Sequence, residues 1–158
     1  MDMARIDTRN DAERSATMHL TDPYDNEGLF LNGEKIEIDF LGVESLTGRK
    51  AGTRMVKAMN RKDGESRSSK DMSAEEILEL ATKNEAVQAE FYADLVTGWR
   101  NITYLETDKL DDEDAEPEVL EFSRNNALKL FKNRAWIRAK ADTFLGKKSH
   151  WKRPVAES

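Results

Sequence analysis

Residues 95–145 have the sequence LVTGWRNITYLETDKLDDEDAEPEVLEFSRNNALKLFKNRAWIRAKADTFL, which joins an apolar helical stripe to a second helical region through an acidic connector. The connector, residues 106–121, contains nine acidic residues, one lysine and Pro117. Charge repulsion and the proline oppose both helix and sheet, so we expect a loop there. This stretch therefore predicts two helical parts that are separated by a charged hinge.

Serine caps mark where the helices on either side of the connector begin. Ser73 and Glu76 have the spacing of a capping box, and a helix that starts there carries its apolar residues at four-residue steps, with a possible break at Asn84. We expect this helix to include Trp99. Ser123 predicts the start of a further helix, which ends or bends at Asn133. A last helix is expected over residues 134–147.

The N-terminal half predicts a small β-meander and one helix. Asn32-Gly33 suits a tight hairpin turn, and Ile36, Ile38 and Phe40 alternate with charged residues, as in a strand with one buried face. A sheet this small must pack on helices or on another subunit. Ser45 then predicts a helix over residues 46–60.

These elements predict an α+β fold that is mainly α, with a small N-terminal β-meander or hairpin followed by a helical body of about four to five helices. The expected organisation is a disordered arm (1–16), a hairpin or meander plus helix (17–60), a linker (61–72), a helical domain (73–148) that includes the acidic connector, and a frayed tail (149–158).

Composition narrows the function classes. The net charge is −6 and there is no cysteine, which excludes disulfides and cysteine-ligated metals. No segment has the length and apolarity of a membrane helix, and the N-terminus lacks the apolar centre of a signal peptide, so we expect a soluble cytoplasmic protein. The charge is divided into blocks, of which the connector carries −8 and residues 122–158 carry +8. We expect these two blocks to neutralise each other.

The residues that chemistry requires are sparse. The chain has two histidines, His19 and His150, and no serine stands in the context of a nucleophile elbow. The acidic connector lacks the glycine of a calcium-binding EF-hand loop. The basic C-terminal block contains aromatic residues, as nucleic-acid-binding segments do, but a pI of about 5.1 disfavours that function. We expect no enzyme activity, cofactor or metal.

The order of the motifs resembles that of phage tail assembly chaperones over about residues 18–146. In the first half, the similar features are the Asp22-Pro23 turn, the Gly33 hairpin, and Gly42 with Ser45 before a basic helix. In the second half they are a leucine-glycine-tryptophan helix end and a helical tail: Leu95, Gly98, Trp99, Phe122, Ser123, Asn125 or Asn126, Leu128, Trp136 and Ile137.

This resemblance implies a non-enzymatic viral tail assembly factor of long-tailed phages, which binds the tape measure protein or the tail tube protein and keeps it soluble before polymerisation. It implies action in the host bacterial cytoplasm and absence from the mature virion. Self-association is left open. Two alternatives remain, a structural virion adaptor or head-tail or minor tail protein, and a nucleic-acid-binding accessory protein.

Docking of an amphipathic helix against an apolar stripe would serve such a chaperone. The candidate partner-binding residues are the apolar side chains of the second half: Phe91, Leu95, Trp99, Leu128, Phe131, Trp136, Ile137 and Phe144. The alternative for each of these residues is a place in the protein's own core.

Overall fold

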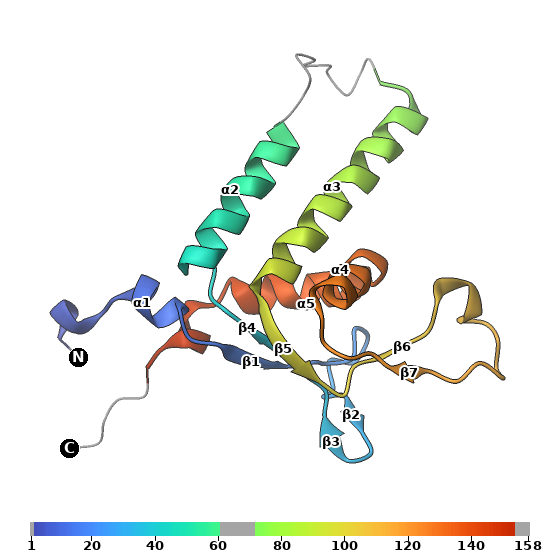
Figure 1. Cartoon of the computed structure of the whole chain (residues 1–158), viewed down its shortest axis with the longest axis horizontal. Coiled ribbons are helices and arrows are strands. Elements are labelled where there is room, and N and C mark those ends of the chain that lie inside the picture. The colour runs from blue at the N-terminus through green and yellow to red at the C-terminus, as the bar shows by residue number, and fades with distance from the viewer. Residues whose placement is uncertain (1, 61–71, 154–158) are drawn as a thin grey trace.

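The computed structural model describes residues 2–60 and 72–153 of the chain, and it confirms an α+β fold that is mainly helical (Figure 1). Five α-helices and seven short strands lie within these residues. In chain order the elements are η1 (Met3–Arg5), α1 (Thr8–Ala12), β1 (Ala16–His19), β2 (Phe30–Leu31), β3 (Glu34–Lys35), β4 (Glu37–Phe40), α2 (Leu46–Asn60), α3 (Ala74–Leu95), β5 (Val96–Arg100), β6 (Thr103–Tyr104), η3 (Thr107–Lys109), β7 (Glu118–Val119), α4 (Arg124–Asn133), α5 (Ala135–Leu145) and η4 (Lys148–Trp151).

The N-terminal strands form the predicted hairpin, β2–β3, and not a meander, because β4 pairs with β1 instead of β3. Asn32 and Gly33 both have positive φ, 51° and 82°, and they connect β2 to β3 in a tight hairpin. Strand β4 then pairs antiparallel with β1, so that Met18 lies opposite Ile38. Ile38 and Phe40 are buried whereas Asp39 between them is not, which confirms the alternation that the sequence predicts.

Trp99 lies in a strand, so the prediction that the helix includes it is wrong. Helix α3 runs without a break at Asn84 but ends at Leu95, and residues 96–100 form β5, which pairs with the free edge of β4. Trp99 is buried in the strand, as it would have been in the predicted helix. It lies opposite Ile38, and its indole Nε1 donates to the Leu120 carbonyl at 2.7 Å. The strand is favoured over a longer helix because it satisfies the backbone hydrogen bonds on the open edge of β4.

The core lies between the three-stranded sheet β1-β4-β5 and the helices α3, α4 and α5. Phe40 on the central strand lies near Phe131 of α4 and Phe144 of α5, with ring centroids 6.3 and 5.9 Å apart. Ser123 Oγ accepts a hydrogen bond from the Asn126 amide at 3.1 Å, and α4 ends at Asn133, as predicted. These helices cover one face of the sheet and exclude water from it.

Both chain ends that the structure describes are more ordered than the sequence predicts. Residues 2–16, expected to be a disordered arm, contain two short helices, and Ala12 is buried. Residues 149–153, expected to be frayed, include the end of η4, where Trp151 is only 5% exposed. Its indole Nε1 donates to the Phe40 carbonyl at 3.1 Å. Both predictions fail because apolar contacts between the two ends offset the low helical propensity of each.

The acidic connector is mostly a loop, with two exceptions. Residues 107–109 form the short helix η3, and Glu118–Val119 forms β7, which pairs with β6. The expectation that the connector contains no sheet is therefore wrong at its C-terminal end, where a backbone edge on β6 is available. The predicted linker, residues 61–72, lies outside the described residues except for Met72.

Candidate functional site

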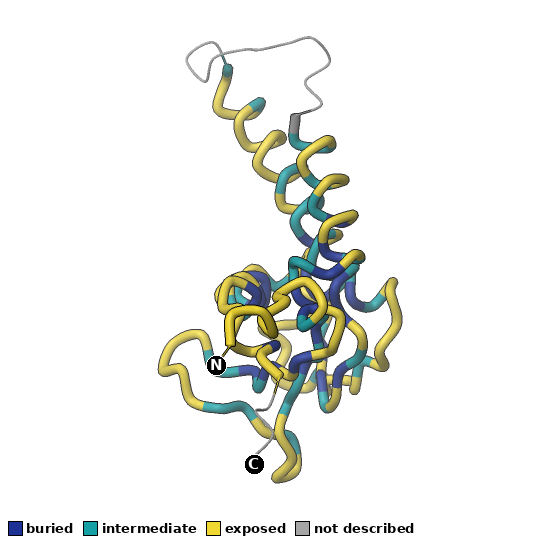
Figure 2. The backbone as a smooth tube through the Cα atoms, turned by 90° about the vertical axis from the view of Figure 1, so that its left-hand side faces the viewer, coloured by how far each residue is buried: buried dark blue, intermediate teal, exposed yellow. Residues whose placement is uncertain are grey.

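Two helices project from the body of the molecule, and no other described element forms a third layer over them. Figure 1 shows α2 and α3 rising side by side from the sheet and the C-terminal helices. No residue of 54–59 or 74–88 is buried, and Figure 2 shows the outer part of both helices in the colours of exposed and intermediate residues. We call these two segments the helical arm. A helix pair of this kind depends on apolar packing, because isolated helices are marginal in water.

The base of the arm is fixed by caps and by one close backbone approach. Ser45 Oγ accepts from the Gly48 amide at 3.0 Å and donates to the Gly42 carbonyl at 2.6 Å, so Ser45 caps α2 as predicted. The Glu13 carboxylate accepts a further N-terminal amide, that of Leu46, at 2.6 Å. A Cβ atom on Gly48 would lie 2.5 Å from the Val43 carbonyl oxygen, so only glycine fits there. These contacts fix the direction in which α2 leaves the body.

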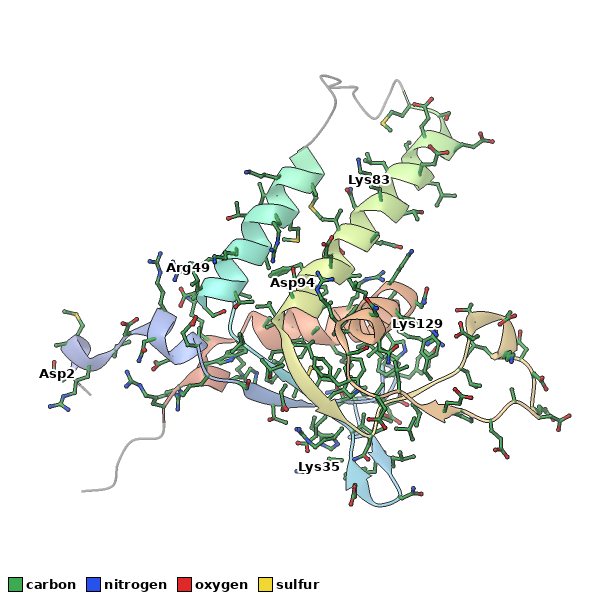
Figure 3. The ribbon with its side chains drawn as sticks, viewed as in Figure 1. Asp2, Lys35, Arg49, Lys83, Asp94 and Lys129 are labelled. Atoms are coloured by element: carbon green, nitrogen blue, oxygen red, sulfur yellow. The ribbon has the colours of Figure 1, made fainter. Side chains whose placement is uncertain are left out.

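Asp94 connects the arm to the helical body. Its side chain is only 9% exposed, and its two oxygens accept from Arg54 of α2 at 3.0 Å and from Arg124 of α4 at 2.8 Å. Figure 3 shows Asp94 at the base of α3, whereas Lys83 lies on the outer part of the same helix. Asp94 therefore ties three helices together at the point where the arm leaves the body.

An open groove runs along α2 at the base of the arm and has a volume of about 630 Å³. Gly52 contributes no side chain, and a Cβ atom built on it would meet nothing within 4 Å, so the α2 backbone is accessible there. The residues that line the groove are Val43, Gly48, Arg49, Gly52, Thr53, Met55, Val56, Lys57 and Phe91. Methionine adapts to differently shaped apolar partners, and the two cations favour an acidic one.

Large apolar side chains on the arm are exposed to solvent. Leu78 is 67% exposed, Val56 54%, and Ile77 and Leu80 each 45%. Together with the groove they give the arm apolar surface on both helices. Several exposed apolar side chains on one projecting part of a protein are typical of an interaction site.

Most of the residues that the sequence analysis predicts to bind a partner belong to the protein's own core. Leu95, Trp99, Phe131 and Ile137 are buried. The other four are partly buried and pack against the core: Phe91, Leu128, Trp136 and Phe144. Of the eight, only Phe91 lines the α2 groove.

Sequence reasoning missed the exposed apolar residues of the arm. Ile77 and Leu78 are recognisable as helix positions, but their spacing alone assigns them to a buried face. The sequence does contain a sign that this part of the helix is exposed: Glu75, Glu76 and Glu79 surround the two apolar residues in the first two turns of α3. The first two turns of α3 are therefore solvated, although the same helix buries Ala89, Ala93 and Leu95 further along.

In the part of the chain that the structure describes, the histidines and acids form no recognisable catalytic group. His19 Nε2 lies 2.9 Å from the Leu29 carbonyl oxygen, and the His150 ring stacks on Phe144 with centroids 4.0 Å apart. Burial, with a smaller effect from Lys147, lowers the pKa of His150 below its ordinary value. Over residues 2–60 and 72–153 there is no group of three or more histidine, aspartate or glutamate side chains that could hold a metal ion.

The two oppositely charged blocks of the second half neutralise each other at only one described salt bridge. Lys129 contacts Glu106 at 2.6 Å. The other described cations of residues 122–153 that form salt bridges contact acids outside the connector: Arg124 with Glu90 and Asp94, Arg138 with Glu85, Lys148 with Glu44, and Arg153 with Asp11. The connector therefore keeps most of its negative charge exposed.

Within the described residues, no helix combines the length and apolarity that crossing a membrane requires. Comparison of the chain with protein-family models, with curated proteins and with solved structures gave no match.

Proposed function

We propose that the protein is a non-enzymatic tail assembly chaperone, which binds the tape measure protein or the tail tube protein and keeps it soluble until the tail polymerises. The observation that carries the proposal is the helical arm, which exposes apolar side chains on both helices, one of them, Val56, in the lining of an open groove. The identity of the partner rests on the resemblance in motif order. In this proposal the protein acts in the host cytoplasm and does not remain in the virion.

The mechanism is reversible coverage of an apolar helix. A long amphipathic helix of the partner would lie along α2, with a small or apolar residue opposite Gly52 and its other apolar residues against Met55 and Phe91. Val56 and the leucines of α3 would extend the contact toward the tip of the arm. Arg49 and Lys57 at the groove would attract acidic residues of the partner and keep the complex soluble.

Co-expression with the candidate partners tests this proposal. We expect the native chain to raise the soluble recovery of the tape measure or tube protein and to co-purify with it. The double variant Leu78→Asp with Leu80→Asp should lose both effects, because the acids disrupt the apolar contact of the arm. Both side chains are exposed, so the variant should fold, which circular dichroism and a urea titration check.

A control places one leucine-to-aspartate change elsewhere on the surface. Leu110, in the acidic connector, is 53% exposed, and Leu110→Asp should leave co-purification unchanged. Equal loss in the arm variant and in the control, or no gain in solubility with the native chain, would count against the proposal.

A structural virion adaptor would use the same kind of surface, because an exposed apolar arm suits permanent assembly as well as transient binding. Mass spectrometry of purified particles distinguishes the two: the chaperone should be absent from them, and an adaptor should be present in a fixed ratio to the other tail proteins.

A further inference from the structure

A second hollow lies at the end of the molecule where the N- and C-terminal segments meet. This pocket has a volume of about 330 Å³, within the range of sites that take a small ligand or a single large side chain. Its apolar lining comes from η1–α1, from the residues after β4 and from the C-terminal turn: Ile6, Ala12, Gly42, Val43, Leu145 and Trp151. We call it the terminal pocket.

The lining of the terminal pocket is held in place by close packing. A Cβ atom on Gly42 would lie 2.7 Å from the Ala12 Cβ, so the two segments touch. The Gly42 amide donates to the Ala12 carbonyl at 2.9 Å, and Arg14 donates to the Trp151 carbonyl at 2.8 Å. The pocket is therefore formed before a ligand binds.

The rim of the terminal pocket is positively charged. Its two acids are already paired, Asp11 with Arg153 at 2.7 Å and Glu44 with Lys148 at 3.1 Å. Contacts with Thr8 and Lys148 lower the pKa of Glu44, so that carboxylate stays charged. Arg5 and Lys152 also line the pocket, and neither has a side-chain partner among the described residues. An apolar hollow with two unpaired cations fits an apolar group that is flanked by acids.

The acidic connector has these properties. Leu110 is 53% exposed and stands in the sequence DKLDDED, residues 108–114, where it is the one large apolar side chain. Glu106 forms the only salt bridge of the connector within the described residues, so the acids around Leu110 are free to meet cations. Leu110 is followed directly by four acids, residues 111–114, and preceded by Lys109 and Asp108, so the connector presents an apolar anchor in a segment of net negative charge.

The pocket and the connector cannot meet within one molecule. Figure 1 shows α1 and the C-terminal segment at one end of the longest axis and the loop between β6 and β7 at the other. We propose that the terminal pocket binds the acidic connector of a second copy of this chain, with Leu110 in the apolar hollow and its neighbouring acids on Arg5 and Lys152.

Such a contact is heterologous, because two different surfaces meet. In a pair, one copy keeps an unused connector and the other keeps an unused pocket. Further copies can therefore add to form an open chain, or the ends can close into a ring. This inference goes beyond the proposed chaperone function and does not depend on the tail proteins.

Sedimentation velocity over a range of protein concentrations tests the proposal. We expect the weight-average sedimentation coefficient of the native chain to rise with concentration, and the rise to weaken at high salt because exposed charges are screened. Leu110→Asp should weaken the association constant by about ten- to a hundredfold, the usual effect of burying one leucine less. Arg5→Glu with Lys152→Glu should do the same from the side of the pocket.

A mixing experiment separates this contact from other modes of self-association. Leu110→Asp retains the pocket, and Arg5→Glu with Lys152→Glu retains the connector. Each variant alone should stay monomeric, whereas an equimolar mixture should form one-to-one pairs that grow no further. Variants that fail to restore each other would overturn the proposal even if the native chain associates.

Leu78→Asp is the matched control, because Leu78 is also an exposed leucine and lies on the helical arm, away from the connector. It should leave self-association unchanged. If Leu78→Asp abolishes association and Leu110→Asp does not, the copies meet through the arm and the proposal is wrong. A native chain that stays monomeric at every concentration would also overturn it. Because Leu78 serves the proposed partner contact and Leu110 the self-contact, failure of one proposal is visible separately from failure of the other.

Discussion

Arg100 forms salt bridges with two acids, Glu37 and Asp39, on the exposed face of the sheet. Its guanidinium donates to both oxygens of Asp39 at 2.8 and 2.9 Å, across the β4–β5 pair. Thr17 of β1 donates to the same carboxylate at 2.6 Å, so the three strands are joined on this face. Chiefly through the Arg100 hydrogen bond, the pKa of Asp39 lies below its ordinary value of 3.8, although burial opposes the effect.

The lowered pKa of Asp39 gives an acid dependence of stability. A carboxyl whose pKa is lower in the folded state stabilises the fold above its unfolded value, near 3.8, and loses this contribution as the pH falls below it. Arg100→Lys cannot contact both oxygens, so we expect a loss of about 1 kcal/mol at neutral pH and a shallower acid decline. Urea titrations at several pH values measure both, and Arg5→Lys, on an exposed residue, should change neither.

Tyr92 gives an alkaline dependence. Burial first, and then the hydrogen bond to Asp142 at 3.0 Å, raise the pKa of Tyr92 to about 12. A raised pKa stabilises the fold fully below the unfolded value of 10.0 and loses this contribution as the pH rises toward 12. Tyr92→Phe should remove a late step from the absorbance titration at alkaline pH. A titration curve that keeps this step in the variant would show that another group produces it.

At the scale of single elements, α2 contains two glycines that should respond oppositely to the same substitution. Gly52→Ala should raise the free energy of unfolding by about 0.5–1 kcal/mol, because its Cβ meets open space and alanine favours helix. Gly48→Ala should lower it by about 1–3 kcal/mol, because its Cβ would lie 2.5 Å from the Val43 oxygen. Urea unfolding of both variants measures the difference, and changes of the same sign would contradict the close approach at Gly48.

The C-terminal turn η4 should contribute to stability far more than a frayed end. Trp151→Ala removes a buried indole from both the core and the terminal pocket, and we expect a loss of about 3–5 kcal/mol. Trp151→Phe keeps most of the apolar surface but loses the hydrogen bond to Phe40, at a cost of about 1–2 kcal/mol. If neither Trp151 variant changed the free energy of unfolding, the C-terminal turn would be frayed, as the sequence predicts.

At the scale of the whole molecule, stability should fall from the body toward the tip of the arm. Residues 74–88 have no buried side chain, whereas Ala89, Ala93 and Leu95 of the same helix are buried. We therefore expect amides of residues 74–88 to exchange hydrogen faster than those of residues 89–95 and of β4. Exchange measured by mass spectrometry tests this gradient, and a bound partner should slow exchange in the arm. Uniform exchange along α3 would contradict it.

Local chemistry made parts of the fold predictable from sequence. Ser45, Ser73 and Ser123 each cap a helix at the expected residue, because a cap depends on a side chain and the amides two or three residues further on. Asn32-Gly33 forms the expected hairpin for a similar reason, since both residues accept positive φ. None of these features requires knowledge of distant residues.

The candidate site was much less predictable, because exposure is a property of the assembled chain. The spacing of Leu95 and Trp99 identified them as apolar positions of an element, and both are indeed buried. Leu78 is likewise an apolar position of a predicted helix, yet Leu78 and its neighbour Leu80 remain exposed. The periodicity of a sequence shows that a helix has an apolar face, but it does not show whether another part of the chain covers that face.

By itself, the sequence determined the fold class, the starts of α2, α3 and α4, the hairpin and the acidic connector within the segment from 95 to 145. Only the tertiary structure decided that Trp99 lies in a strand, that Trp151 belongs to the core and that the arm carries the exposed apolar surface. The physical reason is range: caps and turns are completed within a few residues, whereas strand β5 and the Trp151 contact require partners, β4 and Phe40, that are far away in the chain.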